Sequence, residues 1–228
     1  MILAAGRGER LRPLTDRIPK SLIEVGGRAL IEHHLIALSA VGIREIIINL
    51  AWLGNQIEQR LGDGRAYGVS IAYSRETEGA LETAGGIRHA LPLIGEKPLI
   101  VVSSDVLTDF PFASLLDREP PGFAHLVLID NPPHHPDGDF GLSQGQITRD
   151  VPRRTYSGIG VFRPRSFLDL PAGAKPLRPL FEAAIDAGQL SGEHYKGSWR
   201  DVGSPQRLSE ARAAFDNDPR RVDDLKRG

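Results

Sequence analysis

The sequence has 228 residues, of which 40% are hydrophobic and 25% charged, and its formal net charge at pH 7 is −1. These values are typical of one folded domain with a real core, and they give no overall positive field for nucleic acid or an anionic membrane. The absence of cysteine excludes disulfides and thiolate chemistry and fits a reducing compartment. The apolar run of residues 1–5 ends at Gly6, too early for a signal sequence or a membrane span, so we predict a cytoplasmic protein.

In the first half of the chain, short apolar runs alternate with segments of helical periodicity. The predicted strands are residues 1–5, 45–50, 69–73 and 98–103, and the predicted helices are residues 30–41, 53–61 and 85–91. Repeated strand–helix units favour a layered α/β fold with a largely parallel sheet and helices on both faces. Ligands bind such sheets at the carboxyl ends of the strands, so Gly6 and Asp105, each just past a strand, are expected to share one crevice.

The second half of the chain is less regular. The predicted strands are residues 124–129, 140–147, 156–162 and 189–196, and the predicted helices are residues 177–187 and 205–215. We find no internal repeat and no linker, so we expect a single domain over residues 1–216. Residues 217–228 are mostly charged, and we expect them to form a disordered tail.

The first strand leads directly into Gly6-Arg7-Gly8, which is followed by Arg10 and Lys20. Two glycines spaced by one residue let the backbone approach an anion closely, while a guanidinium and an ammonium supply charge for phosphate oxygens. A Rossmann fingerprint would need a third glycine at the position of Leu11, and a P-loop would need a Gly-Lys-Ser/Thr ending, which is absent. Taken alone, the two glycines could also serve only the geometry of a turn.

Two acids far along the chain add a possible metal site. Asp105 and Asp201 each follow an apolar or aromatic stretch, and isolated carboxylates of this kind suit a divalent cation. Phosphate-binding groups near the N-terminus and two metal-binding acids together suggest nucleotide chemistry.

Three segments resemble motifs of the sugar-1-phosphate nucleotidylyltransferases, the NDP-sugar pyrophosphorylases. They are the signature LAAGRGERL at residues 3–11 with Pro19-Lys20, the base-recognition segment LETAGG at residues 81–86, and the second metal motif WRDVGS at residues 199–204. The resemblance implies a Rossmann-like three-layer α/β/α fold with a mixed, mainly parallel central sheet.

Within the family, the short bacterial N-acetylmuramate α-1-phosphate uridylyltransferases look nearest, on residues 48–54, 126–132 and 191–197. Short mannose-1-phosphate guanylyltransferases share the main motifs. Glucose-1-phosphate thymidylyl- or uridylyltransferase is a further alternative. The implied partners are a nucleoside triphosphate, UTP first, and a sugar 1-phosphate, N-acetylmuramic acid 1-phosphate first. Neither nucleic acid nor a membrane is expected as a partner, and the oligomeric state stays open.

The resemblance also implies residue roles. Arg10 would hold the departing β,γ-phosphates, Lys20 would lie against the α-phosphate, and Asp105 and Asp201 would bind Mg²⁺. The alternatives are a solvated surface lysine for Lys20, a helix N-cap for Asp105 and a turn acid for Asp201.

By the same resemblance, two further sets would bind the substrates. The nucleotide set is Leu3, Ala4, Ala5, Gly6, Gly8, Glu82, Thr83, Gly85 and Gly86. The sugar set is Asn131, Gly141, Ser157, Gly158, Glu193 and Trp199. Gly85 and Gly86 could instead serve a helix-entry turn, and each member of the sugar set could be structural.

The sequence departs from the family pattern before the first metal acid. Ser103 and Ser104 stand in front of Asp105, where the family usually has glycine, and Ser21 replaces the proline usual after the signature lysine. A nucleotide-sugar-binding regulatory domain without turnover is therefore the alternative of another class, although such a domain would not need all four charged residues.

We interpret the loop at residues 134–139, which contains two histidines and two aspartates, as a solvated loop or sugar-site lid rather than a zinc site.

Overall fold

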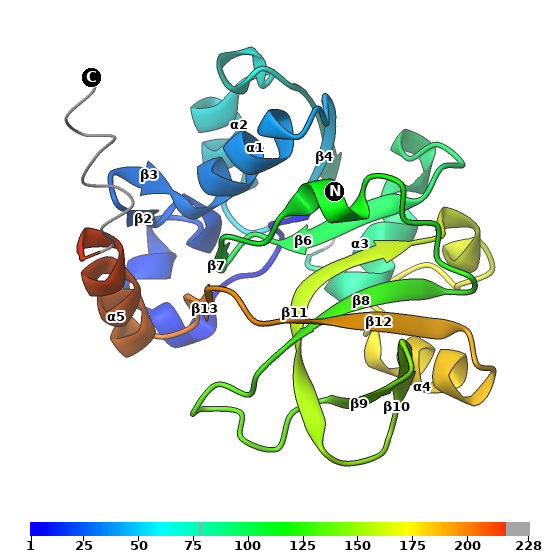
Figure 1. Cartoon of the computed structure of the whole chain (residues 1–228). Coiled ribbons are helices and arrows are strands. Elements are labelled where there is room, and N and C mark those ends of the chain that lie inside the picture. The colour runs from blue at the N-terminus through cyan, green and yellow to red at the C-terminus, as the bar shows by residue number, and fades with distance from the viewer. Residues whose placement is uncertain (78, 218–228) are drawn as a thin grey trace.

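The computed structural model describes residues 1–77 and 79–217, which fold around one nine-stranded mixed sheet (Figure 1). In spatial order its strands are β5 (Ser70–Arg75), β4 (Glu45–Leu50), β1 (Ile2–Leu3), β6 (Leu99–Ser103), β11 (Arg153–Phe162), β8 (Ala124–Ile129), β12 (Leu190–Tyr195), β10 (Gln146–Thr148) and β9 (Phe140–Ser143). Parallel pairing joins β5, β4, β1 and β6, and also β8 with β12. Antiparallel β11 connects these two parallel groups.

Helices cover both faces of the sheet, as predicted for a three-layer α/β/α fold (Figure 1). The α-helices are α1 (Leu30–Ala40), α2 (Gly54–Leu61), α3 (Glu82–Ala90), α4 (Arg178–Asp186) and α5 (Pro205–Asp216). The shorter 3-10 helices are Glu9–Leu11, Leu14–Asp16, Lys20–Leu22, Arg65–Tyr67, Leu91–Leu93, Phe112–Leu115 and Pro164–Phe167. Strand residues alternate between the two cores: Val127 packs with the α1 and α2 residues, while Leu126 and Leu128 pack with those of α3 and α4.

Two short sheets lie beside the main one: β2 (Glu24–Val25) with β3 (Arg28–Ala29), and β7 (Val106–Thr108) with β13 (Trp199–Asp201). A third core joins the signature loop to the C-terminal helix through Leu11, Val202 and Leu208, all buried. Burial of one such side chain contributes about 1.5–3 kcal/mol, so this core fixes the signature loop against the segment after β13.

The predicted elements of the first half are confirmed, with shifted ends. The main difference in the second half is at residues 140–147, which form a β9–β10 hairpin rather than one interrupted strand. Gln144 and Gly145 both have positive φ values, which suit a tight hairpin turn. Of the predicted disordered tail, Asn217 follows α5 directly, and residues 218–228 lie outside the described residues.

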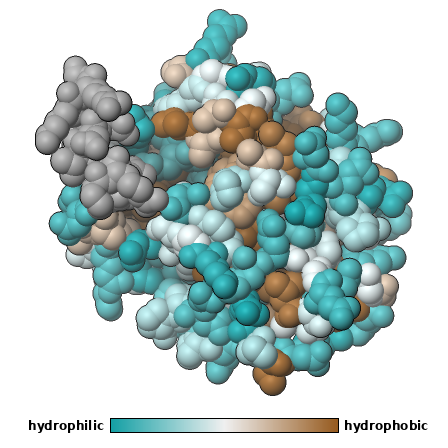
Figure 2. Space-filling view, in the orientation of Figure 1, coloured by the Kyte–Doolittle hydropathy of each residue, from teal (hydrophilic) through white to brown (hydrophobic). Residues whose placement is uncertain are grey.

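The surface is largely polar. Figure 2 shows that hydrophilic residues cover most of one face, with separate hydrophobic areas between them. Within residues 1–77 and 79–217, no helix has both the length and the apolar character to cross a bilayer.

Candidate active site

A cavity of about 380 Å³ opens at the carboxyl ends of β1 and β6, next to the start of α3. Its lining residues are Leu3, Ala5, Gly6, Gly8, Glu9, Arg10, Lys20, Asn49, Ala80, Glu82, Thr83, Ser103, Ser104, Asp105 and Gly203. The prediction that Gly6 and Asp105 share one crevice is confirmed. The cavity also brings together Arg10, Lys20 and six members of the predicted nucleotide set: Leu3, Ala5, Gly6, Gly8, Glu82 and Thr83.

The glycine loop has one open position and one packed position. A Cβ added at Gly6 would meet no atom within 4 Å, so the space in front of this residue is free for a ligand. Gly8 has a φ of +70°, and a Cβ there would lie 3.1 Å from side-chain atoms of Thr15 and Lys20. The Thr15 hydroxyl donates to the Gly8 carbonyl at 2.9 Å. Glycine at position 8 therefore lets the loop turn tightly over Lys20.

Lys20 is not a solvated surface lysine. Its side chain is 13% exposed, and its ammonium donates a hydrogen bond to the Asp105 carboxylate, with which it forms an ion pair. Lys20 begins a 3-10 helix in the signature loop, whereas Asp105 follows β6. The structure thus places a cation and an acid from segments 85 residues apart on one wall of the cavity.

The two predicted metal acids come together through the β7–β13 pair. Asp105 immediately precedes β7, Asp201 ends β13, and the antiparallel register places Asp201 opposite Val106. The Val202 N–H donates to the Asp105 carbonyl at 2.8 Å. Because β7 is a strand, the alternative of a helix N-cap does not apply to Asp105.

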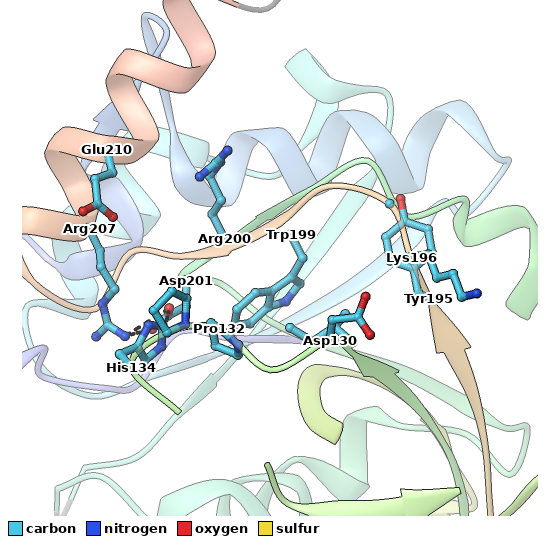
Figure 3. A pocket seen from close by; sticks show the side chains of 13 residues that line it. Asp130, Pro132, His134, Tyr195, Lys196, Trp199, Arg200, Asp201, Arg207 and Glu210 are labelled. Carbon is cyan, nitrogen blue, oxygen red and sulfur yellow. Dashed lines mark hydrogen bonds and ion pairs between the residues drawn. The ribbon is translucent and has the colours of Figure 1, made fainter. Parts of the chain in front are cut away.

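Asp201 lies on a second cavity of about 290 Å³, which also includes Trp199 (Figure 3). At one end, Arg207 and His134 converge on the Asp201 carboxylate, with closest nitrogen–oxygen distances of 2.8 Å and 3.1 Å. Gly203 lines the first cavity, and a Cβ there would lie 2.9 Å from the nearest Asp201 carboxylate oxygen. The segment from Asp201 to Gly203 therefore lies between the two cavities.

Three members of the predicted sugar set lie at or behind a cavity wall, and the other three lie away from both cavities. Trp199 lines the second cavity, and its indole N–H donates to the Ser157 carbonyl at 2.9 Å. The Ser157 hydroxyl is turned away to the Val127 carbonyl, and Gly158, with a φ of +78°, packs against the Ser103 side chain. These two residues therefore support Trp199 and the wall at Ser103 from behind.

The structure does not bring Asn131, Gly141 or Glu193 to either cavity. The Asn131 amide holds its own loop through the carbonyls of Pro136 and Arg153, at 2.8 Å and 3.1 Å. A Cβ at Gly141 would lie 2.3 Å from the Asp150 carbonyl, so that glycine serves the β9–β10 hairpin. Glu193 instead faces the basic side chains of Arg118 and His125, 3.7 Å and 4.0 Å away.

Three members of the predicted nucleotide set lie behind the cavity wall rather than on it: Ala4, Gly85 and Gly86. The Ala4 N–H donates to the Asn49 side chain at 2.9 Å. A Cβ at Gly85 would lie 2.4 Å from the Gly173 carbonyl. These residues shape the wall through close backbone packing.

Sequence reasoning missed Arg207, Asn49 and Glu76. Arg207 lies in the first turn of α5 and pairs with a predicted metal acid, a contact that only the tertiary fold reveals. Asn49 is a polar residue near the end of the apolar strand β4, and this position is a signal that could have pointed to it, whereas Glu76 follows the more polar strand β5. Across the described part of the chain, no three His, Cys, Asp or Glu side chains group as a metal site.

A glycine loop, two cations and an acid on one cavity at the carboxyl ends of parallel strands, with a second acid on the adjoining segment, are typical of α/β nucleotide-binding enzymes. The nucleotidyl transferase family profile matches residues 1–153, and this chain belongs to that family. It is a nucleotidyltransferase, as the motifs predicted.

Curated relatives agree with this assignment, and a solved structure agrees with the fold. The chain is 50% identical over 222 residues to the N-acetylmuramate alpha-1-phosphate uridylyltransferase of Neisseria meningitidis serogroup B, covering 93% of this chain and 96% of that protein. It is 33% identical to the enzyme of the same name from Caulobacter vibrioides, covering 94% and 96%. In fold, it is similar to a Bacillus anthracis protein assigned as a glucose-1-phosphate thymidylyltransferase, with a TM-score of 0.83, 21% identity, and coverage of 95% and 94%.

Proposed function

We propose that this enzyme transfers a uridylyl group from UTP to N-acetylmuramic acid 1-phosphate and releases pyrophosphate. The 50% identity to a uridylyltransferase of that substrate, over nearly the whole of both chains, carries the proposal. The two cavities beside the Asp201–Gly203 segment give it a physical basis, since they provide separate room for a nucleotide and a sugar phosphate. In the cell, we place this activity in the cytoplasm, in the recycling of peptidoglycan precursors.

The reaction needs charge neutralisation rather than a general base. A phosphate oxygen of the sugar 1-phosphate is already an anion, and it attacks the α-phosphorus as pyrophosphate leaves. Bringing two polyanions together is the obstacle, so positioning and fixed positive charge dominate the catalysis. Arg10 would bind the β,γ-phosphates, and Lys20 would stabilise the charge that develops at the α-phosphate.

The residues present fit Mg²⁺. Asp105 and Asp201 supply hard carboxylate oxygens from two adjoining segments, and Mg²⁺ usually takes one or two carboxylates with phosphate oxygens and water. Both carboxylates contact basic groups, Lys20 on one side and Arg207 with His134 on the other, and metal binding would exchange some of these contacts. When bound, Mg²⁺ supplies charge stabilisation at the reacting phosphates.

The test is pyrophosphate release over a grid of substrates with Mg²⁺. UTP, dTTP, GTP, ATP and CTP are combined with the 1-phosphates of N-acetylmuramic acid, N-acetylglucosamine, glucose and mannose. We expect the highest kcat/KM for UTP with N-acetylmuramic acid 1-phosphate. A maximum at GTP with mannose 1-phosphate, or at a glucose 1-phosphate pair, would keep the chemistry and overturn the substrate assignment. A folded protein that binds nucleotide and is inactive throughout the grid would instead support the regulatory alternative.

A further inference from the structure

A buried amide–carboxylate pair lies at the wall of the nucleotide cavity, which Asn49 lines and behind which Glu76 lies. Asn49 in β4 is 3% exposed and Glu76, just after β5, is 4% exposed. The Asn49 amide donates to Glu76 Oε1 at 2.7 Å. Most buried polar groups in proteins are hydrogen-bonded, and an unmade bond is costly, so the partners of this pair are informative.

The pair connects the two walls of the cavity. On one side, Asn49 Oδ1 accepts a hydrogen bond from the Ala4 N–H at 2.9 Å, at the point where β1 ends and the glycine loop begins. On the other side, Glu76 Oε2 accepts from the Leu81 N–H at 2.7 Å, directly before the lining residues Glu82 and Thr83. Each oxygen therefore has a definite donor, and the hydrogen bonds from the two sides converge on the Glu76 carboxylate.

The segment after Glu76 needs such support. Glu82 has a φ of +57°, a left-handed conformation that is uncommon for a residue with a side chain and persists when its surroundings enforce it. Lys175 also holds this segment, because its N–H donates to the Leu81 carbonyl at 3.0 Å. Gly86 packs closely against both side chains, since a Cβ there would lie 2.7 Å from Glu76 Oε1 and 3.0 Å from the Asn49 amide nitrogen.

We propose that Asn49 and Glu76 are positioning residues that set the spacing of the two cavity walls and thereby control nucleotide affinity. They do so through the backbone of Ala4 and Leu81 rather than by chemistry on the phosphates. The proposal rests on the proposed function only in using UTP as the nucleotide probe.

Variants that exchange donors and acceptors at residues 49 and 76 test this proposal. In Glu76→Gln, one of the two donors, the Asn49 amide or the Leu81 N–H, must face the new amide NH₂ instead of an oxygen. In Asn49→Asp, two carboxylates face each other. In the double variant Asn49→Asp with Glu76→Gln, the new carboxylate can accept from Ala4 and from the new amide, whose oxygen still accepts from Leu81. Every hydrogen bond is then restored, and in the bond between residues 49 and 76 the donor is now residue 76 instead of residue 49.

The experiment measures Kd for UTP by calorimetry, KM for each substrate, and hydrogen exchange of the amides at residues 4 and 81 without nucleotide. We expect each single variant to raise the Kd and KM for UTP about tenfold and to accelerate exchange at both amides. The KM for the sugar 1-phosphate should stay within about twofold. The double variant should return all these values to within about threefold of wild type.

Two results would overturn the proposal: single variants with wild-type UTP affinity and exchange, or a folded double variant without rescue. Thermal unfolding identifies variants that fail to fold, and Glu76→Ala, which leaves both donors unpaired, gives a further measure of the expected loss. If wild type binds another nucleotide instead of UTP, the proposed substrate is wrong, and the same measurements with that nucleotide decide the positioning role. The exchange data need no nucleotide at all.

Discussion

Charges in the candidate site are matched in pairs. The Lys20 ammonium faces Asp105, and Arg207 faces Asp201, each from a different segment of the chain. In each pair, the opposite charges of the cation and the acid offset one another. Phosphates and a divalent cation that enter together provide the complementary charges for both members of a pair.

Lys20 is expected to act on the transition state. Lys20→Ala should lower kcat by roughly 10²-fold or more, because it removes the only fixed charge that we place at the α-phosphate. Arg12→Ala is the matched control, since Arg12 is exposed and pairs with Asp16 at 2.9 Å, so its kcat should stay near wild type. Steady-state kinetics with both substrates saturating measures the effect. Wild-type kcat in a folded Lys20→Ala protein would remove this residue from the mechanism.

Asp105 is expected to control the response to Mg²⁺. Asp105→Asn keeps the shape of the side chain and removes one of two carboxylate charges, so Mg²⁺-dependent turnover should be lost. Titration of activity against Mg²⁺ measures this, and Mn²⁺ binding followed by electron paramagnetic resonance gives a readout without turnover. An unchanged metal dependence would show that the metal site has been assigned to the wrong residues.

The structure brings the predicted charged residues together more closely than the predicted sugar set. Arg10 and Lys20 line one cavity because a short motif encodes both their type and their spacing, and Asp105 joins them from the end of β6. In the sugar set, Gly141 and Glu193 serve the hairpin and a polar cluster away from both cavities. A small or acidic residue after a strand has many structural uses, and only the packing distinguishes them.

At the scale of elements, α1 begins on a buried acid. Glu32 is 4% exposed, and its carboxylate accepts hydrogen bonds from the Ala29 N–H, the Arg60 guanidinium and the Tyr67 hydroxyl at 2.7–2.8 Å. Burial alone would raise its pKa, but these hydrogen bonds outweigh burial and lower the pKa from 4.5 to about 2. The acid therefore fixes the start of α1 to α2 and to the turn at Tyr67.

This depressed pKa predicts how stability depends on pH. The contribution of Glu32, about 3 kcal/mol, is fully present above pH 4.5 and is lost as the pH falls from 4.5 toward 2. Glu32→Gln should thus lower the free energy of unfolding by about 2–3 kcal/mol at pH 7 and change it little near pH 2.5. Glu24→Gln is the control, because exposed Glu24 lies 3.5 Å from the same Arg60 and should matter by under about 1 kcal/mol. Urea unfolding at both pH values measures this, and an equal loss at both would contradict it.

The elements that the sequence did not predict are short and depend on distant partners. The strands β7 and β13 have three residues each and pair across more than 90 residues of chain, yet they place both predicted metal acids, Asp105 and Asp201. Hydrophobic periodicity cannot identify strands of this length, since their pairing is fixed by Val202 in the third core and by the Asp105 carbonyl. The long, strongly apolar strands β4, β6 and β8 were predicted because burial alone specifies them.

At the scale of the whole molecule, the two cavities belong to different parts of the sheet. The first cavity lies on the parallel strands β1, β4 and β6, while the second lies at the ends of β8 and β12, beside β13 of the small β7–β13 sheet. They approach each other at the segment from Asp201 to Gly203. Nucleotide and sugar binding should therefore respond to separate sets of side chains, with the two proposed metal acids, Asp105 and Asp201, shared.

This division predicts separable effects on the two substrates. Trp199→Ala removes a large aromatic wall of the second cavity, so the KM for the sugar 1-phosphate should rise about tenfold while the KM for UTP changes by less than twofold. Trp199→Phe keeps a ring but loses the hydrogen bond to the Ser157 carbonyl, and it should have the smaller effect if the ring provides the contact. Initial rates over a matrix of both substrates give the two KM values. A rise in both KM values would mean that Trp199 acts through Asp201, two residues along the strand, and that the two cavities are one binding unit.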